Sequence, residues 1–388
     1  MYSLAHDTWD SREVSALQKV MDSGRYTMGP EVAKFEKEFA NHIGAKYAVM
    51  TNSGSSANLI ALTSIVQNPK YDLRAGDEVI VPAVSWSTTF FPVQQNGLVL
   101  KFVDIDKDTL NIDCNLVEQA ITEKTKAVFA VNLLGNSCEL ADLKRICDNR
   151  GLVLIEDNCE SFGASHQNKY CATWGTAGTF SFFFSHHLQT MEGGMICTPN
   201  EDDYHWLKSL RAHGWCRELP DEFELYNKTG SFFKDSFTFV TPGYSVRPLE
   251  MSGAIGSVQL KKWPKLLEQR IKNYNYFKEL FGDFPHMRMQ KVKHGESTWF
   301  SFGCVLQGKL KGRRDEVIKQ FDTHGIEARP LASGNFLKQP VINLMPHYNH
   351  GNYTGAEDID ENGFWVGNHS TDCKEGILKM YSALKDIK

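Results

Sequence analysis

The sequence predicts an α/β protein: a mostly parallel sheet covered by helices on both faces, followed by a smaller α+β domain. Between residues 46 and 156, short apolar runs typical of buried strands alternate with segments of helical periodicity. After residue 248 this alternation is lost. We therefore expect a large domain over residues 1–247 and a smaller one over 248–388, which a chain of 388 residues can accommodate.

The amino-terminal region predicts two helices on either side of a turn. The first apolar stripe ends at Gly24, and the second begins after Pro30, which suits the first turn of a helix. The apolar residues recur at helical spacing in both stripes: Val14, Leu17, Val20 and Met21, then Val32, Phe35, Phe39 and Ile43.

Strands and helices are then expected in turn along the chain. The strands are predicted at residues 46–50, 78–81, 98–103, 127–131 and 152–156, with helices near Ser55, after Trp86, from Leu116 and near Leu140. Residues 214–244 are interpreted as a loop region. Helices are predicted at 248–262 and near 316–321, with an alternating segment at 298–306. In parallel sheets, ligands bind beyond the carboxyl ends of the strands. Polar candidates lie there: Ser53 to Ser56, Ser85, Trp86, Asn132, Asp157 and Glu160.

Composition excludes several function classes. Hydrophobic residues make up 41% and charged residues 23%, and the net charge is −5, without the basic excess that a nucleic-acid surface needs. No signal peptide and no membrane-spanning apolar run are predicted. Nine cysteines without a Cys-x-x-Cys pair favour reduced thiols in a cytoplasmic enzyme.

A possible phosphate site follows the first strand. The segment Thr51–Asn58 is rich in glycine and serine and opens a helix, so free N–H groups and the helix dipole converge there. Taken alone, the segment is better explained as a capped helix with a serine-rich turn, and the phosphate site gains support only from the other motifs.

A second candidate site lies at Thr179–Met195. Its apolar run at 180–184 predicts a buried strand, which gives way to Ser185, His186 and His187 before Glu192-Gly-Gly. Because neighbouring side chains on a strand point to opposite faces, we do not expect the two histidines to share a metal ion. His187 is expected to be structural.

These candidates together suit a flat, phosphorylated, cationic heteroaromatic cofactor. Gly54-Ser55-Ser56 would hold its phosphate, Trp86 would stack on its ring, and Asp157 would pair with its protonated ring nitrogen. Pyridoxal phosphate has this chemistry. Such enzymes normally carry a lysine that bonds the cofactor, yet no lysine lies between Lys169 and Lys208.

At these motifs the chain resembles the sugar aminotransferase and dehydratase family of pyridoxal-phosphate enzymes, which have the aspartate-aminotransferase fold, transferase fold type I. The resemblance begins near Tyr26–Pro30 and extends into the C-terminal region. It rests on Asn52–Asn58, Val81–Trp86, Val103–Asp106, Glu156–Glu160, Gly243–Arg247, and Ser181-Phe182 in register with Glu192-Gly-Gly. The family's lysine position is occupied by His186, which is typical of the sugar 3-dehydratase branch.

The resemblance implies a role for each matching residue. His186 would be the catalytic base, and Glu160 would lie beside the cofactor ring. Gly54, Ser55 and Ser181 would hold the phosphate. Ser245, where the family usually has asparagine, would reach the phosphate of a neighbouring subunit, with a shorter side chain. The remaining substrate candidates are His213, Arg247 and Arg329.

The resemblance also implies the reaction. The large domain would contain a seven-stranded sheet, and the active site would be shared between the subunits of a homodimer. Because histidine cannot tether the cofactor, pyridoxamine phosphate would be the working form, regenerated by L-glutamate. The expected function is removal of the C3 hydroxyl from a nucleotide-linked 4-keto-6-deoxy sugar in lipopolysaccharide O-antigen synthesis. A sugar aminotransferase with a histidine base is the alternative. A cofactor-binding regulator or a structural protein fits less well.

Overall fold

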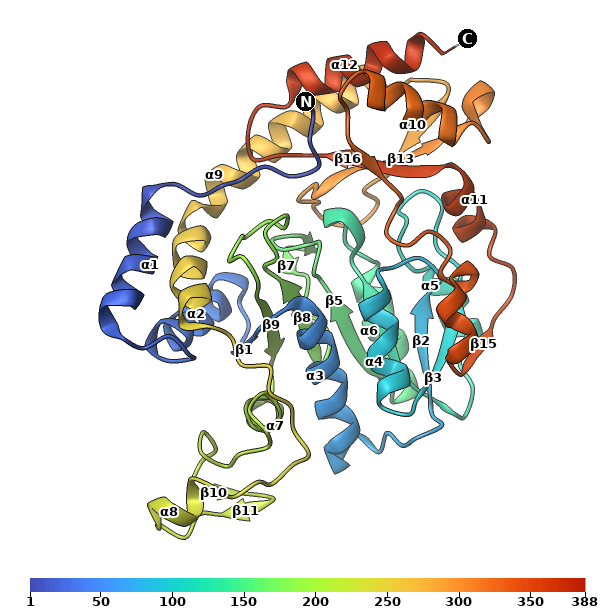
Figure 1. Ribbon diagram of the computed structural model, residues 1–388. Coiled ribbons are helices and arrows are strands. Elements are labelled where there is room, and N and C mark those ends of the chain that lie inside the picture. Colours follow the sequence, from blue (N-terminus) through green and yellow to red (C-terminus); the bar gives the residue numbers. More distant parts are fainter. Residues whose placement is uncertain (388) are drawn as a thin grey trace.

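An eight-stranded sheet forms the centre of the larger lobe of the computed structural model, which describes residues 1–387 (Figure 1). Only β9 runs opposite to the other strands, so the prediction of a mostly parallel sheet is confirmed. A three-residue strand from the C-terminal part lies at one edge, beside the seven strands of the larger lobe. The order across the sheet is β1 (Tyr47–Thr51), β9 (Gly194–Thr198), β8 (Ala177–Ser181), β5 (Val153–Asp157), β4 (Thr125–Val131), β2 (Glu78–Pro82), β3 (Val99–Val103) and β15 (His347–Asn349).

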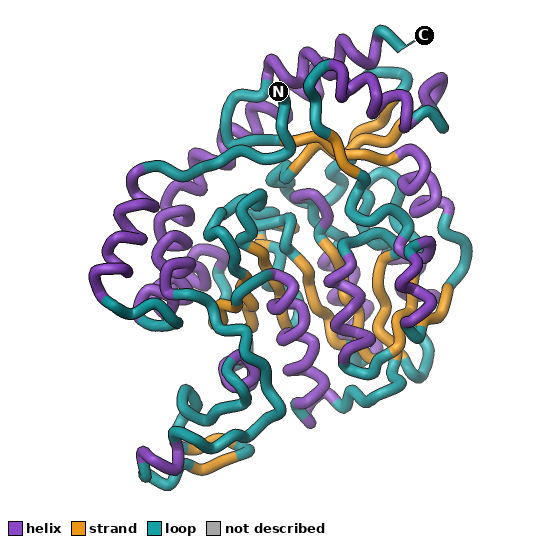
Figure 2. The backbone as a smooth tube through the Cα atoms, in the orientation of Figure 1, coloured by secondary structure: helices purple, strands orange, loops and turns teal. Residues whose placement is uncertain are grey.

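Helices cover both faces of this sheet, as Figure 2 also shows. Val79 and Phe129 point to the face covered by α3 (Gly54–Gln67) and α4 (Ser87–Gln95). Ile80 and Val128, one residue along on the same strands, pack against α5 (Cys114–Ala120) and α6 (Leu140–Arg150). Because successive side chains alternate between faces, the central strands are apolar throughout.

The two amino-terminal helices form as predicted, as α1 (Ser11–Ser23) and α2 (Pro30–Ile43). In α1, however, Val14 and Met21 are exposed and only Val20 of the predicted stripe is buried, so that stripe does not form a core face. Both helices pack against α9 (Glu250–Phe281). The predicted end of α9 at Lys262 is wrong, because the helix continues through Pro264 and buries Phe277 and Phe281 in the smaller lobe.

The smaller lobe contains a four-stranded antiparallel sheet. Its order is β12 (Met287–Met289), β13 (Ser301–Leu306), β16 (Gly363–Gly367) and β14 (Ala328–Arg329), and the helices of this part are α10 (Arg314–Thr323), α11 (Thr354–Asn362) and α12 (Lys374–Lys385). The alternating segment at 298–306 thus contains β13. The domain boundary after residue 247 remains a prediction, and it falls just before α9.

An arm formed by residues 215–240 follows α7 (Glu201–Arg211) and projects from the larger lobe (Figure 1). The region interpreted as a loop contains a short hairpin, β10 (Glu222–Phe223) with β11 (Tyr226–Asn227), and one turn of helix, α8 (Phe232–Asp235). A second short hairpin pairs β6 (Ser165–His166) with β7 (Lys169–Tyr170).

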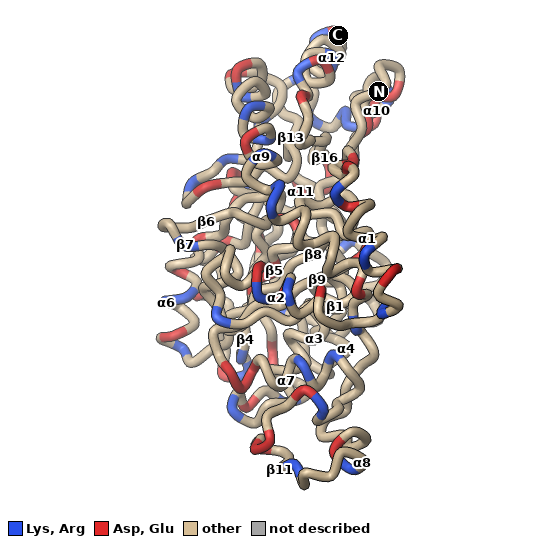
Figure 3. The backbone as a smooth tube through the Cα atoms, turned by 90° about the vertical axis from the view of Figure 1, so that its left-hand side faces the viewer, with Lys and Arg blue, Asp and Glu red and all other residues tan. Residues whose placement is uncertain are grey.

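Charge is dispersed over the molecule. Lysine and arginine are interspersed with aspartate and glutamate in the side view (Figure 3), rather than gathered by sign. Across residues 1–387 the structure has no helix of the length and apolarity needed to cross a membrane.

Candidate active site

Three chain segments meet at the amino-terminal end of α3. Ser53 caps this helix, its Oγ accepting from the backbone N–H of Ser56 at 3.1 Å. A Cβ placed on Gly54 would lie 2.5 Å from Cβ of Ser181 and 2.9 Å from Sγ of Cys159. One placed on Gly194 would lie 2.2 Å from the carbonyl oxygen of Ser53. Glycine is therefore required at both positions, and the first N–H groups of α3 are left for a ligand.

Asp157 lies at the end of β5 and receives three hydrogen bonds. Its Oδ2 accepts from Nδ2 of Asn58 and Oγ1 of Thr89, both at 2.8 Å, and its Oδ1 accepts from the backbone N–H of Cys159 at 3.0 Å. Thr179 Oγ1 donates to Oδ1 of Asn58 at 2.5 Å, which fixes the orientation of that amide. Three donors thus converge on a carboxyl group that is only 5% exposed.

Sequence reasoning missed Asn58, Thr89 and Thr179. One signal was available: Asn58 is an amide on the buried side of α3, whose other buried polar residues are the smaller Thr63 and Ser64. For the two threonines no local signal existed, because their roles depend on contacts with Asp157 and with Asn58, far away in sequence.

Trp86 stands at the amino-terminal end of α4, three residues before Thr89. It is 61% exposed, so it does not fill the core. The preceding Ser85 accepts a hydrogen bond from Oγ of Ser333 at 2.6 Å through its carbonyl oxygen, which ties this segment to the C-terminal part. An indole in this position offers a free ring face for stacking.

Glu160 follows Asp157 and Cys159 in the same loop. Its Oε2 accepts from the backbone N–H of Leu134 at 3.0 Å. Burial raises the pKa of Glu160 to about 7, and the charge of Asp157 adds to the effect while the Leu134 bond opposes it. This carboxyl group can therefore hold a proton at neutral pH.

The raised pKa of Glu160 makes the stability of the cofactor-free protein depend on pH. Above the pKa of an unfolded glutamate, the unfolded chain loses its proton while the folded chain retains it, so stability falls between about pH 4.5 and 7. Glu160→Gln keeps the acceptor for Leu134 and removes this penalty. We expect its unfolding free energy at pH 8 to exceed that of the wild type by about 1–3 kcal/mol, and to match it at pH 5.

Urea unfolding at the two pH values measures this difference. Glu118→Gln, on the exposed side of α5, is the control. A Glu160→Gln difference that is the same at pH 5 and pH 8 would contradict the assignment.

The loop that carries the two histidines starts earlier than predicted. β8 ends at Ser181, not Phe184, and Phe183 and Phe184 are exposed rather than packed in a strand. His186 therefore lies in the turn region between β8 and β9, with its ring 5.3 Å from that of Phe300 and 6.1 Å from that of Phe183. Burial lowers the pKa of His186 to about 4, while the carbonyl groups of Cys159 and Ser181 act in the opposite direction. The imidazole is neutral at pH 7.

His187 faces the interior instead. It is buried against Trp263 and Phe300, with ring centroids 5.2 and 5.3 Å away, and burial holds its pKa well below the usual range. Neither histidine is on a strand, so the alternation argument against a shared metal does not apply. Within the described part of the chain, no group of three or more His, Cys, Asp or Glu side chains is placed to hold a metal.

The remaining predicted residues lie in two other groups. His213 and Arg247 surround Trp215 at the base of the arm, at 4.6 Å between rings and 5.5 Å from guanidinium to ring. Ser245 is exposed and pairs with Ala212 nearby. Arg329 is exposed on β14 in the smaller sheet, opposite Trp365. None of the contacts described for these four residues, His213, Arg247, Ser245 and Arg329, involves Asp157 or His186.

Comparison with known proteins identifies the family. The model of the DegT/DnrJ/EryC1/StrS aminotransferase family matches residues 7–385. The chain belongs to this family. It is 49% identical to GDP-4-keto-6-deoxy-D-mannose 3-dehydratase of Yersinia pseudotuberculosis over 99% of this chain and 98% of that protein. The solved structure of the Escherichia coli GDP-4-keto-6-deoxy-D-mannose 3-dehydratase with bound hydrated PLP superposes with a TM-score of 0.96, at 47% identity and 99% coverage of both chains.

The described residues fit the cofactor of this aminotransferase family. Gly54 lets the amino-terminal end of α3 lie directly against Ser181, where a Cβ would clash, and a helix N-terminus beside a serine hydroxyl is suited to phosphate. Both carboxylate oxygens of Asp157 accept hydrogen bonds from protein donors, an arrangement that suits pairing with a protonated ring nitrogen. Pyridoxal phosphate offers both groups.

Proposed function

We propose that the chain is a PLP/PMP-dependent 3-dehydratase. It removes the C3 hydroxyl of a nucleotide-linked 4-keto-6-deoxy sugar, with L-glutamate as the amino donor, in deoxysugar synthesis for lipopolysaccharide O-antigen. Relatives at 49% and 47% identity are GDP-4-keto-6-deoxy-D-mannose 3-dehydratases, which supports a GDP-linked substrate. One such enzyme has been solved with a trapped PLP–glutamate adduct, at 46% identity to this chain and a TM-score of 0.95, which supports glutamate.

The observation that carries this proposal is His186. His186 follows the end of β8 at Ser181. Its pKa is lowered from the ordinary value of a histidine, so the ring is neutral. No lysine occurs between Lys169 and Lys208 to bond the cofactor. A neutral imidazole can accept and return a proton but cannot act as a covalent tether.

Each residue near the cradle then has a task. Bound here, pyridoxamine phosphate supplies an amine for the sugar ketone and a ring that accepts electrons. Gly54, Ser55 and Ser181 bind the phosphate, and Asp157 keeps the ring nitrogen protonated. A ring nitrogen of His186 takes the proton whose removal drives loss of the C3 hydroxyl. Glu160, with its pKa near 7, holds a proton beside the ring.

We further propose a cytoplasmic homodimer whose two sites are shared between subunits. Ser245, His213 and Arg247 make no contact with Asp157 or His186 in the described chain, which suits residues that serve the site of a partner subunit. All nine cysteines are unpaired, as expected for a reducing compartment.

Product analysis tests the dehydratase reaction. The protein is loaded with pyridoxal phosphate and glutamate, then offered GDP-4-keto-6-deoxymannose, and the products are followed by mass spectrometry. We expect a sugar that has lost the C3 hydroxyl, together with ammonia and 2-oxoglutarate. An amino sugar with the C3 hydroxyl retained would instead establish the aminotransferase alternative.

A further inference from the structure

His186 sits between an exposed and a buried half of the loop formed by residues 182–193. Phe183 and Phe184 before it are exposed, whereas the four residues after it, 187–190, are buried. Its own backbone N–H donates only to the carbonyl of Phe183, at 2.8 Å. The exposed half gives the imidazole little packing, so the buried residues 187–190 are the better fixed side of the loop beside it.

Gln189 is the anchor of the buried half, and it is 3% exposed. Its Oε1 accepts from both the backbone N–H and Oγ1 of Thr8 at 2.9 Å, and its Nε2 donates to the carbonyl of His6 at 2.8 Å. Its backbone carbonyl accepts from Nε1 of Trp9 at 2.9 Å. All of these partners belong to the amino-terminal strap, residues 6–13.

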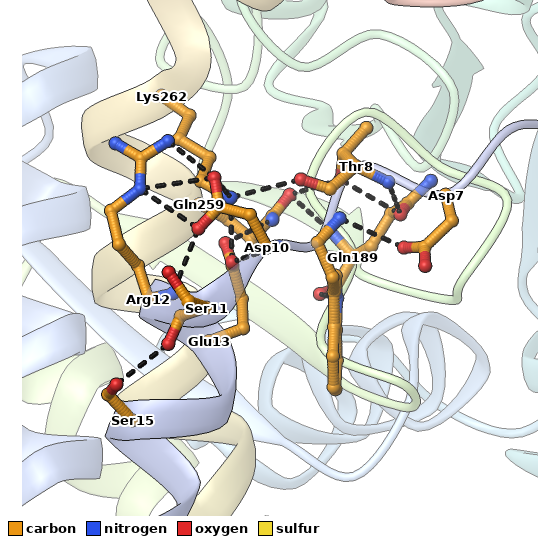
Figure 4. A network of polar contacts seen from close by, with 11 residues as sticks. Asp7, Thr8, Asp10, Ser11, Arg12, Glu13, Ser15, Gln189, Gln259 and Lys262 are labelled. Atoms are coloured by element: carbon orange, nitrogen blue, oxygen red, sulfur yellow. Dashed lines mark hydrogen bonds and ion pairs between the residues drawn. The ribbon is translucent and has the colours of Figure 1, made fainter.

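The strap is itself clamped to α9 by a buried polar network (Figure 4). Thr8 Oγ1 also lies 2.8 Å from Oε1 of Gln259, whose Nε2 donates to Oε1 of Glu13 at 2.7 Å. Glu13 is fully buried and pairs with Lys262 at 2.6 Å. Breaking a buried ion pair leaves an uncompensated charge, so this clamp resists displacement.

The same helix also contacts the loop directly. Oγ of Ser252 donates to the carbonyl of Thr190 at 3.3 Å, and Oε1 of Gln259 accepts from the backbone N–H of Gln189 at 3.3 Å. Trp263 packs on the ring of His187. Residues 187–190 are thus gripped between the strap and one face of α9, one residue away from the imidazole.

We propose that Gln189 is a positioning residue for His186, and that the amino-terminal strap holds it through Thr8 and Trp9. The inference rests on the proposed role of His186 as the base. Proton transfer requires the two partners within hydrogen-bond reach, and a displacement of about 1 Å can cost about 100-fold in rate. The strap therefore acts on proton transfer through the position of the loop.

Thr8→Val tests this, because it removes the hydroxyl and keeps the shape of the side chain. We expect amide hydrogen exchange in residues 183–190 of the cofactor-free protein to rise by about tenfold, as a lost hydrogen bond of ~1.4 kcal/mol would produce. The rate of the glutamate half-reaction, followed by cofactor absorbance, should fall by about tenfold with cofactor affinity changed less than about threefold. Thr8→Ser restores both readouts, and Trp9→Phe, which removes one donor to Gln189, shows a smaller effect.

Ser15→Ala is the matched control, since that hydroxyl bonds only to the carbonyl of Ser11 on the exposed face of α1. The proposal is overturned if amide hydrogen exchange in residues 183–190 matches the wild type in both Thr8→Val and Trp9→Phe. It is also overturned if Thr8→Ser loses as much of the half-reaction rate as Thr8→Val. The hydrogen-exchange measurement does not depend on catalysis, so it tests the strap even if His186 proves not to be the base.

Discussion

Replacing His186 with asparagine lowers the rate of the glutamate half-reaction by about 10²–10⁴, the usual contribution of a positioned base. Asparagine is similar in reach but cannot accept a proton. Cofactor affinity should stay within about threefold of wild type, because the proposed contacts to the phosphate and the ring nitrogen come from Ser181 and Asp157 rather than from His186. Stopped-flow absorbance measures the rate, and titration with pyridoxal phosphate measures the affinity.

Two further variants make this test specific. His187→Asn is the comparison variant: because His187 faces Trp263 and can act only through the position of the loop, its rate should fall by no more than about tenfold. His186→Lys should bond the cofactor covalently, seen by mass spectrometry after borohydride reduction, and suppress dehydration. Full turnover by His186→Asn would remove this residue as the base, and the absence of a covalent adduct in His186→Lys would contradict its place at the family's lysine position.

The lowered pKa of His186 also predicts how the rate of the glutamate half-reaction depends on pH. Because the pKa of His186 is lowered to about 4, the imidazole remains a free base through pH 5–7. In the pH profile of the glutamate half-reaction, the loss of rate caused by protonation of His186 in the free enzyme should therefore occur near pH 4 and not near pH 6.5.

The second large effect is expected at Asp157. Asp157→Asn removes the charge that we propose pairs with the ring nitrogen. It also places an amide donor among the donors that surround this side chain. A hydrogen bond to a charged group contributes about 1.5–3 kcal/mol, so cofactor affinity should fall by about 10- to 150-fold. The half-reaction should slow by at least about 100-fold, since an unprotonated ring accepts electrons poorly.

Asp203→Asn provides the matched control. Asp203 is equally buried and accepts from the hydroxyl of Tyr71 at 2.5 Å, but it lies on α7 away from the cradle. Thermal unfolding of both variants separates lost stability from lost binding. Wild-type cofactor affinity in Asp157→Asn would show that this carboxylate does not hold the ring.

The positions at strand ends could be predicted because they depend on local patterns. Asp157 and Ser181 each end a buried strand, and Gly54 opens a helix directly after another, so a parallel sheet places them at one edge. Their proximity in the structure follows from that register. The end of β8 was predicted three residues late, because an apolar run of phenylalanines does not reveal that Phe183 and Phe184 turn outward.

Residues that act through distant partners could not be predicted. Phe300 contacts both histidines from more than 100 positions later in the chain, and Thr8 reaches Gln189 from the other end. The continuation of α9 past Pro264 was also missed, because its buried residues there face a second lobe whose packing no local period reveals.

The pairing of β15 with β3 has a consequence for how this chain can be divided. β15 lies beyond residue 340, yet it closes the outer edge of the large sheet in parallel register with residues 100–102. A fragment ending at residue 247 would expose the unpaired amide and carbonyl groups along β3, and such an edge can pair with a strand of another molecule. It would also lose α9, which covers Phe35. Chimeras built between relatives should therefore exchange residues 347–349 together with the first half of the chain.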